Sequence, residues 1–314
     1  MLKGYLKLLT GACAIAACAT VAAPKAAEAF TWTYGMDSAY DGTGGGLNGE
    51  AHGVGPQSKY EAFGMAFTAD NDTVTFAFNA NFGIGGHYSS GAHNNNITWG
   101  DFFLNLDPSK NFTDSKAAGS VLGIRFAEGN ESNQSGTGIF SDVTTTATAG
   151  SNNGWTSYGR YNRYVRNKGG SVELIDGMTR RQSQRYLGSH GQNSISGGTK
   201  IGDISILNDS ALANMGLDFA SQGGAGVETF GFSFARSLLP GGSLDWVAHV
   251  MAECTNDTVG MTGEFAAQTP PPGGNPGDPG NPGTPPNEAV PEPFSMIGAG
   301  LALGAGAVLK KRQK

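Results

Sequence analysis

Charged residues are scarce in this chain of 314 residues. Asp, Glu, Lys and Arg make up 15% of the sequence, compared with about 25% in an average globular protein. With so few charges, and little repetition of Glu, Lys and Leu, a coiled coil is excluded. The formal net charge of -6 argues against nucleic acid as a partner, because binding to phosphates needs lysine and arginine. Three cysteines are too few for a disulfide scaffold.

Glycine, in contrast, is abundant, with 50 residues of the 314, about twice the usual share of roughly 7%. The glycines follow no Gly-X-Y period, which excludes collagen. Catalytic motifs are also missing: the sequence contains no G-x-S-x-G, no H-E-x-x-H and no P-loop lysine signature. The composition therefore favours a glycine-rich, all-β body, and we expect no intrinsic catalytic activity.

The first 29 residues have the layout of a secretory signal peptide. Two lysines precede an apolar run from Leu8 to Ala23, and small residues at Ala27 and Ala29 follow. This order is typical of export signals, so we expect signal peptidase to remove residues 1–29. An alternative stays open, because the tetrapeptide Ile-Ala-Ala-Cys ending at Cys18 is similar to a lipobox and would make the protein a lipoprotein anchored at that cysteine.

The C-terminal part divides into a linker and a three-part tail. Residues 269–289 are rich in Pro, Gly, Asn and Asp, a composition typical of an extended tether. The uncharged stretch 294–309 predicts a short transmembrane helix of about 24 Å, less than the roughly 30 Å of a bilayer core. Before this stretch lies the Val-Pro-Glu-Pro motif, formed by Val290, Pro291, Glu292 and Pro293. After it lies the basic tail 310–314, which contains Lys310, Lys311 and Arg312.

This order of motif, apolar stretch and basic tail in residues 290–314 resembles the PEP-CTERM sorting signal. The resemblance implies that an exosortase, a membrane cysteine transpeptidase, recognises the tail and cuts near the Val-Pro-Glu-Pro motif. The precursor would be anchored in the inner membrane, and the mature protein would lie at the cell surface or be secreted. A plain single-span membrane anchor is the alternative.

Residues 30–268 form the expected ectodomain, with a formal charge of -9. Runs of β-branched and aromatic residues alternate with Gly, Asn, Asp and Ser, which predicts short strands separated by turns. The expected strands are 30–34, 60–68, 73–82, 97–106, 121–126, 138–146, 227–234 and 244–253. The best helix candidate is 210–219. Together they predict a β-sandwich or jelly roll with long Gly/Asn/Ser loops.

The clearest local prediction is a β-hairpin formed by 60–68 and 73–82. In the second strand Val74, Phe76 and Phe78 share one face, because side chains alternate along a strand. The polar residues 69–72 between the two strands are typical of a tight turn.

The ectodomain also resembles a family of exosortase-dependent surface proteins best known from cyanobacteria. The segments that carry the resemblance are 99–103 (WGDFF), 119–127 (GSVLGIRFA), 230–232 (FGF), 236–240 (RSLLP) and 252–257 (AECTND). The resemblance implies export and a surface location, and it supplies no activity. In that family the residue after the cysteine is usually glycine, whereas here Thr255 follows Cys254, which alters the turn.

A basic segment with aromatic residues is the candidate binding surface. Seven of the 13 basic residues of the ectodomain lie between positions 160 and 185, interleaved with tyrosines. Arginines and aromatic rings can pair with anionic groups and stack on sugars, so a carbohydrate-binding module is the alternative function. The candidate contacts with extracellular polysaccharide are Arg160, Arg163, Arg166, Tyr161 and Tyr164. A solvated loop with its tyrosines at the core edge is the simpler interpretation.

Candidate metal ligands are few, and we expect no cofactor other than Ca²⁺. Asp70 and Asp72 are the candidates, since calcium prefers oxygen-rich loops, although such side chains also cap turns without a metal. The sequence Asn-Asp-Thr-Val at this loop recurs at 256–259. His87 and His93 lie six residues apart in one loop, where solvated histidines are common without a metal.

A hydrolase is the least favoured class. Its chemistry would need two paired carboxylates at a defined separation. Glu61, Asp101 and Glu253 are candidates of the right residue type, but the sequence does not bring any two of them together.

Overall fold

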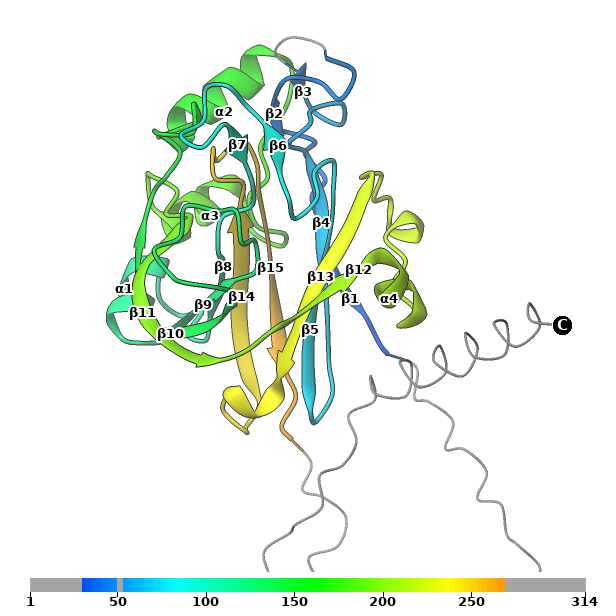
Figure 1. The fold of residues 1–314 in the computed structure, drawn as a ribbon, viewed down its shortest axis with the longest axis vertical. Coiled ribbons are helices and arrows are strands. Elements are labelled where there is room, and N and C mark those ends of the chain that lie inside the picture. Colours follow the sequence, from blue (N-terminus) through cyan, green and yellow to red (C-terminus); the bar gives the residue numbers. More distant parts are fainter. Residues whose placement is uncertain (1–29, 50–52, 269–314) are drawn as a thin grey trace, which may run out of the picture. The chain divides into compact units, whose positions relative to one another are not determined.

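Two antiparallel sheets face each other across one apolar core (Figure 1). The computed structural model describes residues 30–49 and 53–268, so the expected signal peptide, linker and sorting tail lie outside the described residues. Within this part the chain is mostly β-sheet with few short helices, which confirms the all-β class. No helix among the described residues is both long and apolar enough to span a bilayer.

The first sheet contains five strands in the order β1-β4-β5-β13-β12. Their bounds are β1 Thr33–Met36, β4 Ala62–Ala69, β5 Thr73–Ala80, β12 Ser205–Asn208 and β13 Glu228–Ala235. The predicted hairpin is confirmed, because β4 pairs with β5 and Phe67 lies opposite Phe76. Asp70 closes its turn: one carboxylate oxygen accepts the backbone N–H of Asp72 at 2.8 Å and of Thr73 at 2.7 Å.

The second sheet contains six strands in the order β11-β10-β9-β8-β14-β15. Their bounds are β8 Phe102–Asn105, β9 Val121–Arg125, β10 Gly138–Thr146, β11 Ser194–Gly202, β14 Leu244–Met251 and β15 Thr258–Phe265. Two short ladders lie outside both sheets: β2 Thr43–Gly44 pairs with β3 Gly53–Val54, and β6 His87–Tyr88 pairs with β7 Asn96–Ile97.

The predicted strand 97–106 is wrong in its length, because the chain leaves the sheet in its middle. β7 ends at Ile97 and β8 begins at Phe102. Between them Gly100 donates its N–H to the carbonyl of Met251, and a side chain at this position would lie 2.2 Å from the carbonyl oxygen of Asn193. The close approach of three chain segments therefore interrupts the strand.

The helices are short, and they lie outside the two sheets (Figure 1). They are α1 Phe112–Ala117, α2 Tyr158–Asn167, α3 Arg180–Leu187 and α4 Asp209–Asn214, with 3₁₀ turns at Ala220–Gln222 and Arg236–Leu238. α2 lies at one end of the sheets. α4 lies within the predicted helix 210–219 except for its first residue. The basic segment, interpreted above as a loop, is helical in α2 and α3. Residues 172–175 belong to no strand, and Val172, Leu174 and Ile175 pack into the core.

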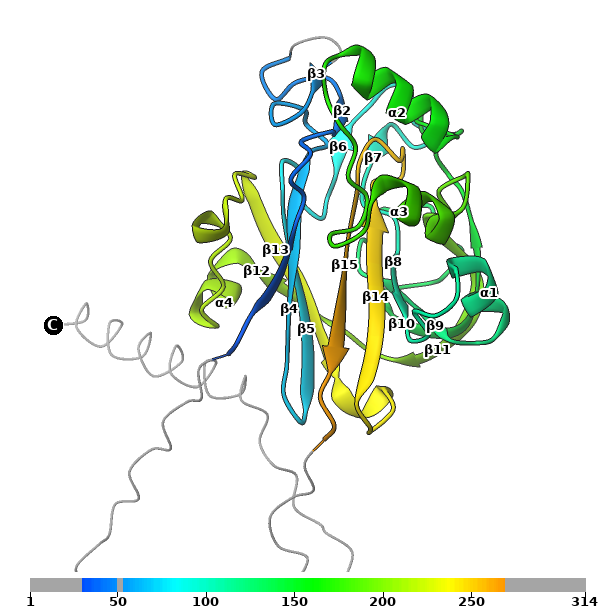
Figure 2. The same cartoon turned by 180° about the vertical axis from the view of Figure 1, so that it is seen from behind.

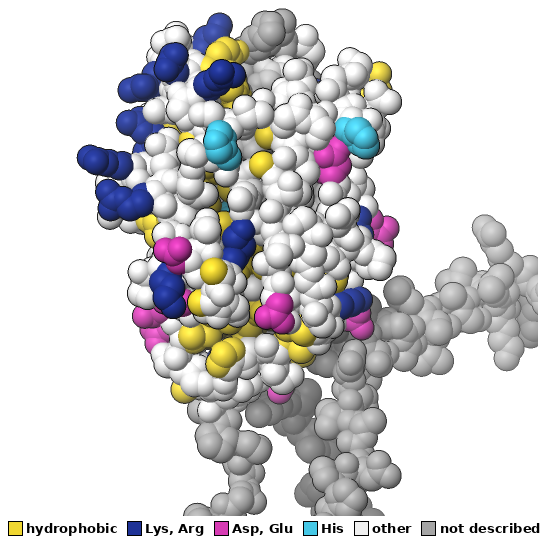
Figure 3. Space-filling model, turned by 90° about the vertical axis from the view of Figure 1, so that its left-hand side faces the viewer, with side chains coloured by type: hydrophobic (Ala, Val, Ile, Leu, Met, Phe, Trp, Pro, Cys, Tyr) yellow, Lys and Arg dark blue, Asp and Glu magenta, His cyan; other side chains and the backbone are white. Residues whose placement is uncertain are grey.

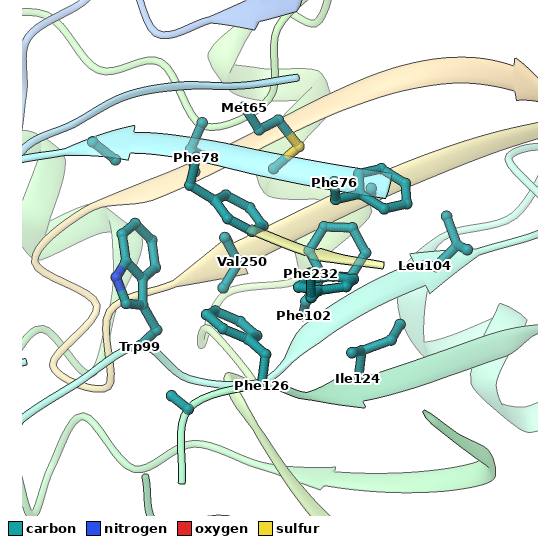
Figure 4. Packing of buried hydrophobic residues seen from close by; sticks show 14 of the residues in the cluster. Met65, Phe76, Phe78, Trp99, Phe102, Leu104, Ile124, Phe126, Phe232 and Val250 are labelled. Atoms are coloured by element: carbon teal, nitrogen blue, oxygen red, sulfur yellow. The ribbon is translucent and has the colours of Figure 1, made fainter. Parts of the chain in front are cut away.

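The central core is built largely from phenylalanine (Figure 4). Phe76 and Phe78 of β5 point at Phe102 of β8, with ring centroids 4.7 Å and 5.9 Å apart. Phe126 and Phe232 join the same cluster from the two opposite sheets. Such aromatic pairs contribute about 0.5–1.5 kcal/mol each beyond the area that they bury. The face of β5 predicted to be apolar is therefore the face that lines the core.

Each sheet also has a smaller apolar cluster on the side away from the central core. Figure 2 shows α1 and α3 beside the six-stranded sheet and α2 beyond the upper ends of its strands, near β2 and β3. Tyr161 and Val165 of α2 join a cluster that includes Val247 of β14. α4 covers the five-stranded sheet, where Leu212 joins a cluster with Ala77 of β5. The helices are therefore held by their buried sides, and their other sides are left to solvent.

Candidate functional site

A cleft of about 530 Å³ is lined by β2, the residues just before β4, the loop before α2 and α2 itself. The labels β2 and α2 lie near the top of Figure 1. Trp155 and Tyr164 form one wall, with ring centroids 5.0 Å apart and planes inclined by 42°. The indole N–H of Trp155 donates a hydrogen bond of 2.6 Å to the hydroxyl of Thr43, which fixes the ring. Asn152 and Asn256 add amide groups to the lining. Flat rings beside hydrogen-bonding amides suit a polar ligand with an apolar face.

The wall of the cleft depends on a close approach of two backbone segments. Trp155 donates its N–H to the carbonyl of Cys254 at 2.8 Å. A side chain at Gly154 would lie 1.9 Å from that same carbonyl oxygen, so only glycine fits here. Cys254 itself is buried and unpaired, and burial raises the pKa of its thiol. The thiol is therefore held in its neutral, unreactive form.

Four buried carboxylates lie beside the cleft, on residues that neighbour its lining in the sequence. Thr43, Tyr60 and Asn256 line the cleft. In the sequence, the buried residue Asp41 lies close to Thr43, Glu61 follows Tyr60, and Asp257 follows Asn256. The fourth is Asp37, and ligand oxygens of Asp37, Asp41 and Asp257 all lie within 4.8 Å of one another. We call Asp37, Asp41, Glu61 and Asp257 the acidic cluster.

Backbone N–H groups hold one oxygen of each carboxylate in the acidic cluster. Asp37 accepts from Ala39 at 2.9 Å, Asp41 from Glu173 at 3.0 Å, and Glu61 from Gly42 at 2.8 Å. Asp257 accepts at both oxygens, from Ala62 at 2.7 Å and Thr258 at 2.6 Å. The second oxygens of the other three have no hydrogen-bond partner. No ion pair of the described residues includes any of the four.

This burial makes ionisation of the acidic cluster unfavourable. Burial raises the pKa of Glu61 to about 10, and the charges of Asp257 and Asp37 add to the effect. Burial likewise raises the pKa of Asp257 to about 7. The pKa values of Asp37 and Asp41 are raised well above their usual range, first by burial and then by the charge of Asp257. Carboxylates buried together need protons or a cation to offset their charge.

The candidate polysaccharide contacts divide between the surface and the core. Arg160, Arg163 and Arg166 are exposed on the outer side of α2, and Figure 3 shows Lys and Arg side chains gathered along one upper edge of this face. Tyr164 is half-buried and lines the cleft. Tyr161 is a correction: it is fully buried, and its hydroxyl donates to the carbonyl of Asp41 at 3.0 Å, so it is unavailable to a polysaccharide.

A sequence signal for this arrangement existed and was missed. Tyr158, Tyr161 and Val165 recur at spacings of three and four, and all three are buried. That spacing is typical of the inner side of a helix, and Arg160, Arg163 and Arg166 occupy other positions, on its outer side.

The metal candidates from the sequence are not brought together. Asp70 and Asp72 are exposed and lie in the β4–β5 turn. His93 pairs with Glu131 at 3.2 Å, whereas a ring nitrogen of His87 lies 3.3 Å from the carbonyl oxygen of Asn81. The recurrence of Asn-Asp-Thr-Val is more informative, because its second copy contains Asp257 of the acidic cluster.

Of the three hydrolase candidates, Glu61 belongs to the acidic cluster, and Asp101 and Glu253 brace the fold from within. Asp101 accepts from the N–H of Ile195 at 2.6 Å and from the amide of Asn130 at 2.9 Å, and burial raises its pKa to about 6. Glu253 accepts from the N–H of Thr98 at 3.0 Å, and burial raises its pKa as well. Both carboxylates are fully buried and tie loops to the sheets.

Comparison with known proteins supplies no relative. No family model matches the chain, and neither a curated protein nor a solved structure matches it. The resemblance to exosortase-dependent surface proteins therefore stays a prediction from the sequence. Function must be inferred from the residues and the geometry of this chain.

Proposed function

We propose that this protein is exported and becomes a component of the cell surface or extracellular matrix. Signal peptidase would remove residues 1–29, and an exosortase would process the tail at 290–314. The observation that carries the proposal is the order of the three tail parts: Val-Pro-Glu-Pro, an uncharged stretch and a basic end. A body with a charge of -9 also favours a partner other than nucleic acid.

We infer that the body is a β-sandwich rather than a jelly roll. Consecutive strands pair within one sheet: β4 with β5, β14 with β15, and β8 through β11 as a meander. A jelly roll is built from two Greek keys, in which a long connection returns the fourth strand beside the first. A sandwich of hairpins leaves its loops at the ends of the sheets, a suitable scaffold for display.

Fractionation of the native host, with and without its exosortase, tests the proposal. We expect the mature protein at the surface or in the medium of the intact host, and a longer precursor in the inner membrane when the exosortase is deleted. Glu292→Ala should reproduce the deletion, whereas Glu288→Ala, a matched carboxylate in the linker, should be processed normally. Identical masses and locations in the two hosts would contradict the proposal.

We propose as a second function that the body binds an acidic extracellular polysaccharide. The cleft supports this, because Trp155 and Tyr164 present aromatic rings beside amide groups. The exposed arginines of α2 support it too, since Tyr164 belongs to the same helix. Guanidinium groups pair with carboxylate or sulfate groups, so an acidic chain could contact α2 while one sugar occupies the cleft.

Binding to an acidic and a neutral polysaccharide separates the two contacts. Replacing Arg160, Arg163 and Arg166 by Ala should weaken binding of the acidic polymer tenfold or more, about 1.4 kcal/mol, with weaker dependence on salt. Trp155→Ala should weaken binding of both polymers. The control replaces Lys110 and Lys200, exposed cations on other elements, and should change little. Unchanged binding in the arginine variant would refute this second function.

A further inference from the structure

The acidic cluster combines its carboxylates from three distant parts of the chain. Asp37 and Asp41 lie in the loop after β1, Glu61 directly precedes β4, and Asp257 directly precedes β15. Their exposed fractions are 6% for Asp37, 0% for Asp41 and Glu61, and 1% for Asp257. Surface acids need no partner, but carboxylates buried to this degree are normally paired or bound to a metal.

The unpartnered oxygens indicate what this cluster binds. Asp37, Asp41 and Glu61 each use one oxygen for a backbone N–H, and each keeps a second, buried oxygen with no hydrogen-bond partner. Three unpartnered carboxylate oxygens in one buried cluster leave its negative charge without a donor or a cation to offset it. A single cation bound by Asp37, Asp41 and Asp257 would offset that charge, with Glu61 close enough to act on it.

We propose that the acidic cluster is a Ca²⁺ site in which Asp37, Asp41 and Asp257 are ligands and Glu61 is a further ligand or a close counter-charge. The three aspartate oxygens lie within 4.8 Å of one another. Oxygens on opposite sides of one Ca²⁺ lie about 4.6–5.2 Å apart, because each bond is about 2.3–2.6 Å long. The three residues therefore have the spacing that one calcium ion requires.

The donor set separates calcium from other metals. All ligands are oxygens, whereas zinc and copper sites use histidine or cysteine. Magnesium usually keeps several waters and binds one or two carboxylates, which fits a buried group of four carboxylates less well. Glu173 and Asp176, both half-buried, add negative charge near Asp37, which favours entry of a divalent cation from this side.

The ion would link segments of both sheets and so stabilise the fold. Its ligands come from the loop after β1, from the start of β4 in the five-stranded sheet and from the start of β15 in the six-stranded sheet. The segment between α2 and α3 joins through Glu173, whose N–H binds Asp41. This inference goes beyond export and polysaccharide binding, and it depends on neither.

Thermal unfolding of the full chain in mild detergent tests whether calcium binds to and stabilises the protein. Calcium at a hundredfold excess over its Kd should raise the Tm by about 5–10 °C relative to EGTA, and the same concentration of magnesium should have a smaller effect. The variant D37N/D41N should lose the shift and should melt at a higher temperature than the wild type in EGTA, because two crowded carboxylates become amides.

Asp70→Asn is the matched control, because an asparagine oxygen can keep the same turn hydrogen bonds, and it should keep the full shift. The proposal is overturned if calcium does not shift the wild type, if D37N/D41N shifts equally, or if Asp70→Asn abolishes the shift. Terbium luminescence keeps the test valid should the double variant fail to fold. Terbium can replace calcium in such a site, and the buried ring of Tyr161 beside Asp41 should sensitise its emission. Added calcium should displace the terbium and remove this emission. A wild-type protein without terbium emission would also overturn the proposal.

Discussion

Thr255 has a backbone conformation that β-branched residues rarely adopt, with a φ of 51°. It is buried to 1%, and its hydroxyl has no hydrogen-bond partner. Two hydrogen bonds fix this conformation. The carbonyl of Cys254 accepts the N–H of Trp155, and the N–H of Thr255 donates to the carbonyl of Ala252 at 2.7 Å. A tight turn of this kind suits glycine, which gives a physical reason for the glycine expected at this position.

Thr255→Gly should therefore stabilise the protein. The left-handed conformation costs about 1–2 kcal/mol for a residue with a Cβ, and glycine costs about 0.5–1 kcal/mol in the entropy of the unfolded chain. The net gain should be about 1 kcal/mol in the free energy of unfolding by urea. Thr262→Gly, at an exposed position of β15, is the control and should destabilise. A loss of stability in Thr255→Gly would refute this explanation.

His249 is fully buried among Phe103, Phe112 and Tyr186, with ring centroids 5.5, 4.8 and 5.8 Å away. Neither ring nitrogen has a hydrogen-bond partner. Burial lowers the pKa of this imidazole to about 3, and the charge of Lys116 adds to the effect. The folded protein therefore keeps His249 neutral where the unfolded chain, with a pKa of about 6.5, takes up a proton.

This difference makes a pH prediction with a definite sign. Above pH 6.5 His249 is neutral in both states and contributes no pH dependence. As the pH falls from 6.5 towards 3, the unfolded state binds the extra proton, so the wild type loses stability. The advantage of His249→Leu over the wild type should grow by about 1.4 kcal/mol per pH unit below pH 6. An advantage that stays constant between pH 7.5 and 5 would contradict the assignment.

At the scale of elements, α3 begins with a capping box. The hydroxyl of Thr179 accepts the N–H of Gln182 at 3.3 Å, and the side chain of Gln182 accepts the N–H of Thr179 at 2.9 Å. Thr179→Ala should cost about 1 kcal/mol of unfolding free energy in urea. Thr199→Ala, exposed on β11, should change stability by less than about 0.5 kcal/mol. Equal losses of unfolding free energy in the two variants would contradict a capping role for Thr179.

The strands that the sequence predicts well are those with uninterrupted alternation. In β5 the apolar residues Val74, Phe76 and Phe78 lie in the core. β15 is not among the expected strands, because its glycines interrupt the alternation of apolar and polar residues. At Gly263 a side chain would lie 2.2 Å from the ring of Trp246, so this glycine allows a tryptophan to lie flat on the strand. Local sequence does not distinguish a glycine of this kind from one in a turn.

The acidic cluster could not be predicted from the sequence for a related reason. The same four residues, Asn-Asp-Thr-Val, occur at the β4–β5 turn and at the start of β15. In the first copy Asp72 is exposed and donates its N–H to Asp70, whereas in the second Asp257 is buried and accepts the N–H of Ala62, 195 residues away in the chain. Burial set by such long-range contacts decides the chemistry of each copy, and no short motif encodes it.

At the scale of the whole molecule, charge is sorted by location. The body carries a formal charge of -9, yet four of its carboxylates are buried in the acidic cluster. Its basic residues are concentrated in the segment that forms α2 and α3. The outer sides of these helices are therefore basic on a body that is acidic as a whole, which agrees with the acidic polymer proposed as a ligand.

We propose that the body is exported and separated from both of its ends. The sharpest test is the intact mass of the protein recovered from the surface or medium of its native host. We expect a chain that begins at Phe30 and ends near Pro293, with the basic residues Lys310 to Lys314 removed. A recovered surface protein that still contains Lys314 would contradict it.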